Sequence, residues 1–124
     1  MQGYEAKIID SSKELTAKEK IQMKDTTDAI RLDEASSQEA LIIKPKSYAV
    51  IQIHNEQSEN KDYEVYVVVD ENNNKYVTGS QAFFSTFKNI WDEMVGEDEA
   101  WELKIYRMPS KNYAGREFIT CSIV

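Results

Sequence analysis

Residues 61–94 read KDYEVYVVVDENNNKYVTGSQAFFSTFKNIWDEM, and the spacing of the apolar residues changes within this one stretch. From Tyr63 to Val69 every second residue is apolar, which is the spacing of a β-strand. The three asparagines at 72–74 tolerate the positive φ angles of a tight turn. We therefore expect residues 75–78 to return as the partner strand of a β-hairpin.

A helix is predicted directly after this hairpin. Ser80 is a suitable N-cap, and Gly96 is a suitable end point. Between them, apolar residues recur at spacings of three and four, which predicts one apolar helix face that packs into the core. The residues of this face are Phe83, Phe87, Ile90, Trp91 and Met94.

Further strands are predicted on both sides of this stretch. Residues 41–54 contain two apolar runs around Pro45, and residues 101–107 and 117–123 have strand-like sequences after the helix. From residue 41 the order is strand, strand, strand, helix, strand, strand. This order predicts a mainly β fold, a five-stranded OB-fold-like barrel with one helix between strands 3 and 4. A small α+β sheet is the alternative.

The first 40 residues are more polar. Residues around Ala6 alternate as in a short strand, and Thr16 with Glu19 has the spacing of a helix capping box. Residues 33–40, DEASSQEA, have the composition of a mobile linker. The predicted organisation is an N-terminal extension over 1–40 and an OB-fold-like domain over 41–124.

Composition limits the class of protein. The chain has 124 residues, 41% of them hydrophobic and 30% charged, with a formal net charge of −7, as in a soluble globular protein. Its apolar runs are far shorter than the roughly 18 residues of a membrane span, and no signal peptide is visible at the start. A single cysteine favours a reducing, cytoplasmic setting.

Residues that would carry catalysis are scarce. One histidine, His54, and one cysteine, Cys121, cannot form a zinc site of the usual composition. Cys121 lies in an apolar strand, so we expect it to be a core residue and not the nucleophile of a Cys–His pair. The four glycines form no phosphate-binding loop. The sequence therefore predicts neither an enzyme nor a metal or cofactor site.

Residues 104–116, KIYRMPSKNYAGR, carry four basic residues and no acidic ones within this acidic chain. Single-stranded nucleic acid is bound by cations that follow the phosphates and by aromatic rings on which bases stack. We therefore expect sequence-tolerant, non-catalytic binding of a single-stranded nucleic acid, centred on this stretch. Lys104, Tyr106 and Met108 would share one strand face. The candidate binding residues are Lys104, Tyr106, Arg107, Lys111, Tyr113 and Arg116, with Lys61, Tyr66, Lys75 and Tyr76 from the preceding hairpin and its loop.

An acidic stretch supports a different hypothesis. Residues 92–102, DEMVGEDEAWE, carry six acidic residues and no basic ones. Such a surface would bind and inhibit a nucleic-acid enzyme by presenting carboxylates where phosphates would lie. The candidate residues for this protein-binding alternative are Asp92, Glu93, Glu97, Asp98, Glu99 and Glu102. A plain oligomeric scaffold is a third possibility.

Several segments together carry a resemblance to a known group. They are KEKIQMKDTTDAIRLDE at 18–34, YAVIQIHNE at 48–56, the opening stretch at 61–94, and YRMPSKNYAGREFITCSIV at 106–124. The chain resembles small single-stranded DNA-binding proteins of bacteriophages that infect Gram-positive bacteria.

The resemblance implies an OB-fold, a place in the cytoplasm of an infected host cell, and a role in phage DNA replication or recombination. It also implies self-association and partners among replication or recombination proteins. At the residue level it points to Lys111, Tyr113 and Arg116, and to Tyr76. The chain departs from many such proteins at its end, because FITCSIV at 118–124 is a strand-like segment and not an acidic tail.

Overall fold

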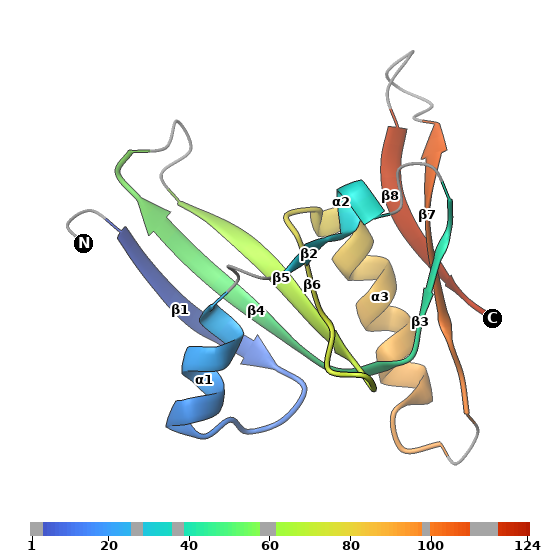
Figure 1. The fold of residues 1–124 in the computed structure, drawn as a ribbon, viewed down its shortest axis with the longest axis horizontal. Helices are drawn as coiled ribbons and strands as arrows, with labels where there is room; N and C mark the ends of the chain where they lie inside the picture. Colours follow the sequence, from blue (N-terminus) through green and yellow to red (C-terminus); the bar gives the residue numbers. More distant parts are fainter. Residues whose placement is uncertain (1–3, 26–28, 36–38, 58–61, 98–99, 110–116) are drawn as a thin grey trace.

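The computed structural model describes residues 4–25, 29–35, 39–57, 62–97, 100–109 and 117–124. These residues form two separate β-sheets with one long helix between them (Figure 1). In chain order the elements are β1 (Tyr4–Ser11), α1 (Ala17–Lys24), β2 (Ile30–Arg31), α2 (Leu32–Ala35), β3 (Leu41–Ile43), β4 (Pro45–Asn55), β5 (Asp62–Asp70), β6 (Lys75–Thr78), α3 (Gln81–Met94), β7 (Leu103–Pro109) and β8 (Glu117–Ile123).

The larger sheet has five strands in the order β1-β4-β5-β6-β2. Its strands pair antiparallel except for β2, which runs parallel to β6. Because side chains alternate between the two faces of a strand, neighbouring residues of β4 and β5 pack on different helices. Tyr48 and Val68 belong to the core around α3, whereas Ala49 and Val67 belong to the core around α1.

The smaller sheet has three antiparallel strands in the order β3-β7-β8. Only Lys44 separates β3 from β4, so the chain passes directly from one sheet into the other. Phe83 and Phe87 of α3 are fully buried between the sheets. Their cluster includes Val68 of the five-stranded sheet and Ile105 of the three-stranded sheet, so α3 supplies one core to both.

The local predictions made from the sequence are confirmed. Strand β6 covers residues 75–78, and Asn73 in the turn before it has a φ of 66°. The Ser80 side chain accepts a hydrogen bond from the backbone N–H of Phe83, and Gly96 follows the helix with a φ of 89°. The capping box of Thr16 and Glu19 is also present, at the start of α1.

The prediction of a five-stranded OB-fold-like barrel is not supported, because the two sheets do not join into one. The edge of β6 that is not bonded to β5 pairs with Ile30 and Arg31 of β2, and not with β8. The aromatic side chains of α3 fill the space between the sheets. The fold is mainly β, and the alternative expected from the sequence, a small α+β arrangement, fits it.

The first third of the chain is built into the same structure. β1 pairs with β4 along most of its length, and β2 is an edge strand of the same sheet. Leu32, at the start of α2, has an exposed fraction of 0% and lies in the α3 core. Of the predicted linker over 33–40, residues 33–35 are helical, and residues 36–38 lie outside the described residues.

Candidate functional site on the three-stranded sheet

The two faces of the three-stranded sheet differ in what covers them. In β7, Leu103 and Ile105 point into the α3 core and are fully buried. Lys104 and Tyr106 alternate with them and therefore lie on the opposite face, as predicted from the sequence. No described helix packs against this second face, which turns away from α3 in Figure 1.

Strand register identifies the other members of this surface. Lys104 is paired with Ile42 of β3 on one side and Ser122 of β8 on the other. Tyr106 is paired with Thr120, and Met108 with Phe118. We call this surface the outer face, and it consists of Ile42, Lys104, Tyr106, Met108, Phe118, Thr120 and Ser122.

The outer face exposes large apolar side chains. Ile42 is 53% exposed, and Met108 and Phe118 are each 42% exposed. The water-facing side of a sheet usually carries polar residues. Single apolar residues exposed on a surface are common and need no explanation. Here they share one face with Tyr106, so they form a group that a binding partner can cover.

A cation and two aromatic rings lie close together on this face. The Lys104 ammonium is 5.5 Å from the centre of the Tyr106 ring, which is a cation–π distance. The Tyr106 hydroxyl forms a 2.8 Å hydrogen bond with the Ser122 hydroxyl, which fixes the ring on the sheet. Phe118 is the diagonal neighbour of Tyr106, a position about 7–8 Å away in an antiparallel pair. The face thus combines an anchored ring, an exposed ring and an ammonium group.

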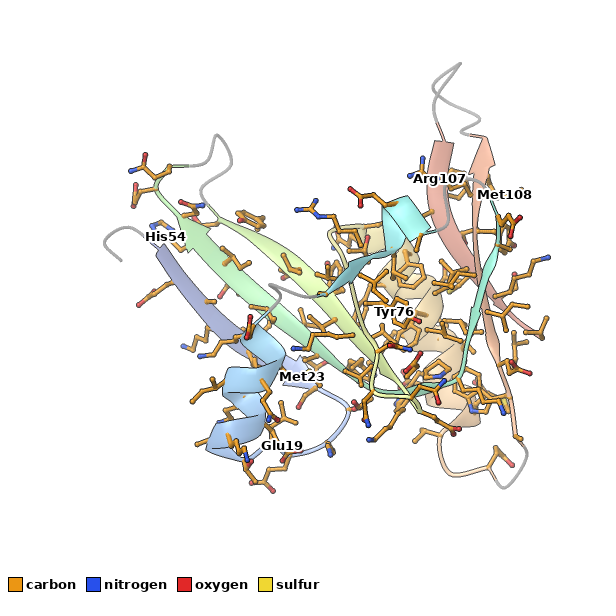
Figure 2. The ribbon with its side chains drawn as sticks, viewed as in Figure 1. Glu19, Met23, His54, Tyr76, Arg107 and Met108 are labelled. Carbon is orange, nitrogen blue, oxygen red and sulfur yellow. The ribbon has the colours of Figure 1, made fainter. Side chains whose placement is uncertain are left out.

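The other residues of the predicted basic stretch are not all on this face. Arg107 is paired with the buried Ile119 and lies on the opposite side of β7, near one end of the strand (Figure 2). Lys111, Tyr113 and Arg116 lie outside the described residues, as does Lys61.

Tyr66 and Tyr76 were expected to be stacking residues, but both are buried in the core. Tyr66 is 4% exposed, and its ring stacks on Phe84 of α3 with ring centres 4.4 Å apart. Burial, followed by its hydrogen bond to Glu64, raises the pKa of Tyr66 to about 12. Tyr76 is 5% exposed and donates its hydroxyl to Asp70 over 3.1 Å (Figure 2). In this structure neither ring face is open to a base.

Lys75 has a structural role on the other side of the molecule. Its ammonium group donates to the backbone carbonyls of Gln22 and Asp25, the latter at 2.7 Å. These are carbonyls at the C-terminal end of α1, where backbone acceptors lack partners within the helix. Lys75 thus ties the β5–β6 hairpin to α1 and is not part of the outer face.

The acidic candidates lie at the end of α3 and beyond it. Asp92 forms an ion pair with Lys88, which lies one turn earlier in the helix, at 2.7 Å. This contact is the main cause that raises the pKa of Lys88. Glu93, Glu97 and Glu102 are exposed, and Asp98 and Glu99 lie outside the described residues.

The residues considered for catalysis do not form a nucleophilic site. Cys121 is 4% exposed, and burial raises the pKa of its thiol to about 12, opposite to what a nucleophilic thiolate requires. His54 contacts Asp62 at 2.7 Å and Glu56 at 2.6 Å. Among the described residues, no group of three or more side chains is arranged to hold a metal ion.

Sequence reasoning missed four members of the outer face, Ile42, Phe118, Thr120 and Ser122. Phe118 could have been found, because Phe118, Thr120 and Ser122 alternate with the apolar residues of β8. Ile42 gave no such signal, since it lies between two other apolar residues in a three-residue strand.

Comparison with known proteins returned no match, whether to family models, to curated proteins or to solved structures. None of the helices in the described parts of the chain is long and apolar enough to cross a membrane.

Proposed function

We propose that this protein binds single-stranded DNA without catalysis and with little sequence preference, and that the outer face is the binding surface. The observation that supports this most is the exposure of Phe118 and Met108 beside Tyr106 and Lys104 on one uncovered sheet face. Unpaired bases have two apolar faces, and their backbone carries one negative charge per nucleotide. A surface with rings and an ammonium group complements both features.

The interactions that the outer face offers are strong enough to bind a single strand. Stacking of a base on an aromatic ring is worth about 1–3 kcal/mol, whichever base it is. Lys104 can leave its cation–π contact for a phosphate while the Tyr106 ring stays in place through its bond to Ser122. The segment that joins β7 to β8 adds Lys111, Tyr113 and Arg116 in sequence. The acidic remainder of the chain would repel nucleic acid elsewhere on the surface.

The wider setting follows from the resemblance to phage single-stranded DNA-binding proteins. The proposal includes the cytoplasm of an infected bacterium, a role in replication or recombination, and self-association. The order of β4, β5, β6, α3, β7 and β8 supports an open variant of the OB arrangement, in which β2 occupies the edge that would close the barrel.

The test is a titration with oligo(dT) of about 30 nucleotides, longer than the site of a typical single binding domain. We expect binding at low salt that weakens as salt rises, with a log–log slope of about −0.7 for each phosphate neutralised. Duplex DNA of the same length should bind more weakly. Absence of binding to the single strand at low salt would overturn the proposal.

The variant Phe118→Ala locates the surface. It should weaken oligo(dT) binding by about 1–3 kcal/mol, because one stacking ring is lost. The matched control is Ile123→Ala on the same strand, since Ile123 is 45% exposed but alternates onto the opposite side. If the two variants bound oligo(dT) with equal affinity, the binding site would not be on the outer face.

A second candidate function uses the exposed carboxylates of Glu93, Glu97 and Glu102. In this case the protein would bind a host nucleic-acid enzyme in place of DNA. Capture of a host polymerase or nuclease that is abolished by Glu97→Lys and unaffected by Phe118→Ala would favour this function over DNA binding.

A further inference from the structure

A cleft of about 440 Å³ lies between α1 and the turn that joins β5 to β6. It is on the α1 side of the five-stranded sheet, whereas the outer face belongs to the other sheet (Figure 1). Three lysines from three different segments line it: Lys13 before α1, Lys46 of β4 and Lys75 of β6. Among the described residues of the lining, Glu19 of α1 is the single acidic one; Figure 2 labels it on this helix.

The charges of this cleft do not cancel. Lys13 forms a 3.1 Å ion pair with Glu19. Lys46, by contrast, donates to the neutral side-chain oxygen of Asn73 over 3.0 Å, and Lys75 donates only to backbone carbonyls. In the part of the chain that the structure describes, neither Lys46 nor Lys75 forms an ion pair. The three lysines and one glutamate among the described lining residues sum to a charge of +2, in a chain of net charge −7.

The walls of the cleft are held in place before any ligand arrives. The buried Asp70 carboxylate accepts bonds from the backbone N–H groups of Asn72 and Asn74, from the Asn74 amide and from the Tyr76 hydroxyl. These bonds fix the turn that carries Asn73 and Lys75. On the other side, α1 is fixed by its capping box and by the contact of Lys75 with its last turn. A rigid site loses little conformational entropy on binding.

The lining also offers groups for the rest of a ligand. Leu15 and Met23 supply an apolar floor, while Gln22, Ser47 and Asn73 supply amide and hydroxyl groups. An apolar surface with a few polar groups, in a volume of about 300–1,000 Å³, is typical of small-molecule sites.

We propose that this cleft binds a phosphate monoester through Lys46 and Lys75, with the organic part of the ester against Leu15 and Met23. A monoester carries about −1.5 to −2 charges at pH 7, which matches the charge of the lining, whereas a backbone phosphodiester carries only one. Two sources offer this group, a free nucleotide and the 5′-phosphate at the end of a DNA strand. The inference does not rest on DNA binding by the outer face.

The test follows backbone amide shifts by NMR while thymidine 5′-monophosphate is added, with thymidine as the control without phosphate. The amides of Gln22, Asn73 and Lys75 should shift with the nucleotide and not with thymidine. Equal shifts with both compounds, or no shift with either millimolar nucleotide or a 5′-phosphorylated oligo(dT), would overturn the proposal. Amides of Lys104 and Thr120 report on the outer face separately, so failure of one site is distinguishable from failure of the other.

Two lysine variants provide a matched pair. Lys46→Gln should weaken nucleotide binding about tenfold, because a hydrogen bond between charged groups is lost. Lys44→Gln removes the same charge two residues away, from an exposed side chain outside this cleft, and should change affinity less than twofold. Equal losses would mean that the anion responds to general surface charge, and would contradict the proposed site.

Oligonucleotides with and without a 5′-phosphate identify the source of the group. If thymidine 5′-monophosphate shifts the cleft amides, the free nucleotide is a ligand. If only the 5′-phosphorylated oligo(dT) shifts them, the ligand is the strand end. If both oligonucleotides shift them equally, phosphodiesters are sufficient and the preference for a monoester is wrong.

Discussion

The two sheets of this protein share one helix but are covered differently. The five-stranded sheet has α3 on one face and α1 on the other, and its strands β4, β5 and β6 contribute none of the large exposed apolar side chains. The three-stranded sheet has only α3, and it exposes Ile42, Met108 and Phe118 on the outer face. Among the described residues, the outer face is a sheet face without a helix against it, and three large exposed apolar side chains gather there. For this reason we place the binding surface on the outer face.

Removing the shared helix contact should affect both sheets at once. Phe83 is fully buried and belongs to the core that joins them. Phe83→Ala should lower the free energy of unfolding by about 3–5 kcal/mol, because it leaves a large cavity. Urea denaturation followed by circular dichroism measures this loss.

The control for Phe83→Ala is Ser85→Ala on the exposed side of α3, which should change stability by less than about 0.5 kcal/mol. A similar, small loss in both variants would contradict the view that α3 forms one core with the two sheets.

A pair of isoleucine variants sharpens the contrast between the two faces of the three-stranded sheet. Ile105 is fully buried on the α3 side, whereas Ile42, which pairs with Lys104 from the adjacent strand, is 53% exposed on the outer face. Ile105→Ala should cost about 2–5 kcal/mol of stability, and Ile42→Ala less than about 1 kcal/mol. If Ile42→Ala proved as costly as Ile105→Ala in thermal or urea unfolding, the outer face would be covered in solution.

The smallest expected effect concerns the far end of the five-stranded sheet, where His54 lies between Asp62 and Glu56. The hydrogen bond to Asp62 is the larger cause, and the hydrogen bond to Glu56 the smaller one, that raise the pKa of His54 above 6.5. The charged imidazole is favoured in the folded state, so its stabilising effect is fully present below pH 6.5. It is lost as pH rises through the higher folded pKa.

His54 is the single histidine of the chain, so its ring signals in NMR give one titration curve. We expect a midpoint above 6.5 that moves back toward the ordinary value in Asp62→Asn. A midpoint at or below 6.5 in the unmodified protein would show that the carboxylates do not hold the imidazole.

The sequence was sufficient for features that depend on neighbouring residues. Ser80, the apolar spacing after it and the asparagine turn each act over a few residues, and the structure has the predicted helix and hairpin. Barrel closure depends on pairing between distant segments. The two-residue strand at Ile30 and Arg31, which occupies the edge of β6, has no periodicity that could have revealed it.

The candidate site was predicted in part for a related reason. Alternation correctly separated Lys104 and Tyr106 from the buried residues of β7. In β5, however, Val67, Val68 and Val69 are apolar on both faces, so the pattern could not tell which face meets α3. Tyr66 was therefore assigned to a surface when its ring lies against Phe84.

The buried thiol of Cys121 can be used to measure local opening of the three-stranded sheet. Cys121 is the single cysteine, and it lies in the middle of the edge strand β8. The residue is 4% exposed, and burial raises the pKa of the thiol to about 12. A thiol reagent can therefore modify the chain only during the moments when β8 separates from the α3 core. The rate of thiol modification therefore measures how often β8 opens. A ligand that covers the outer face should lower this rate.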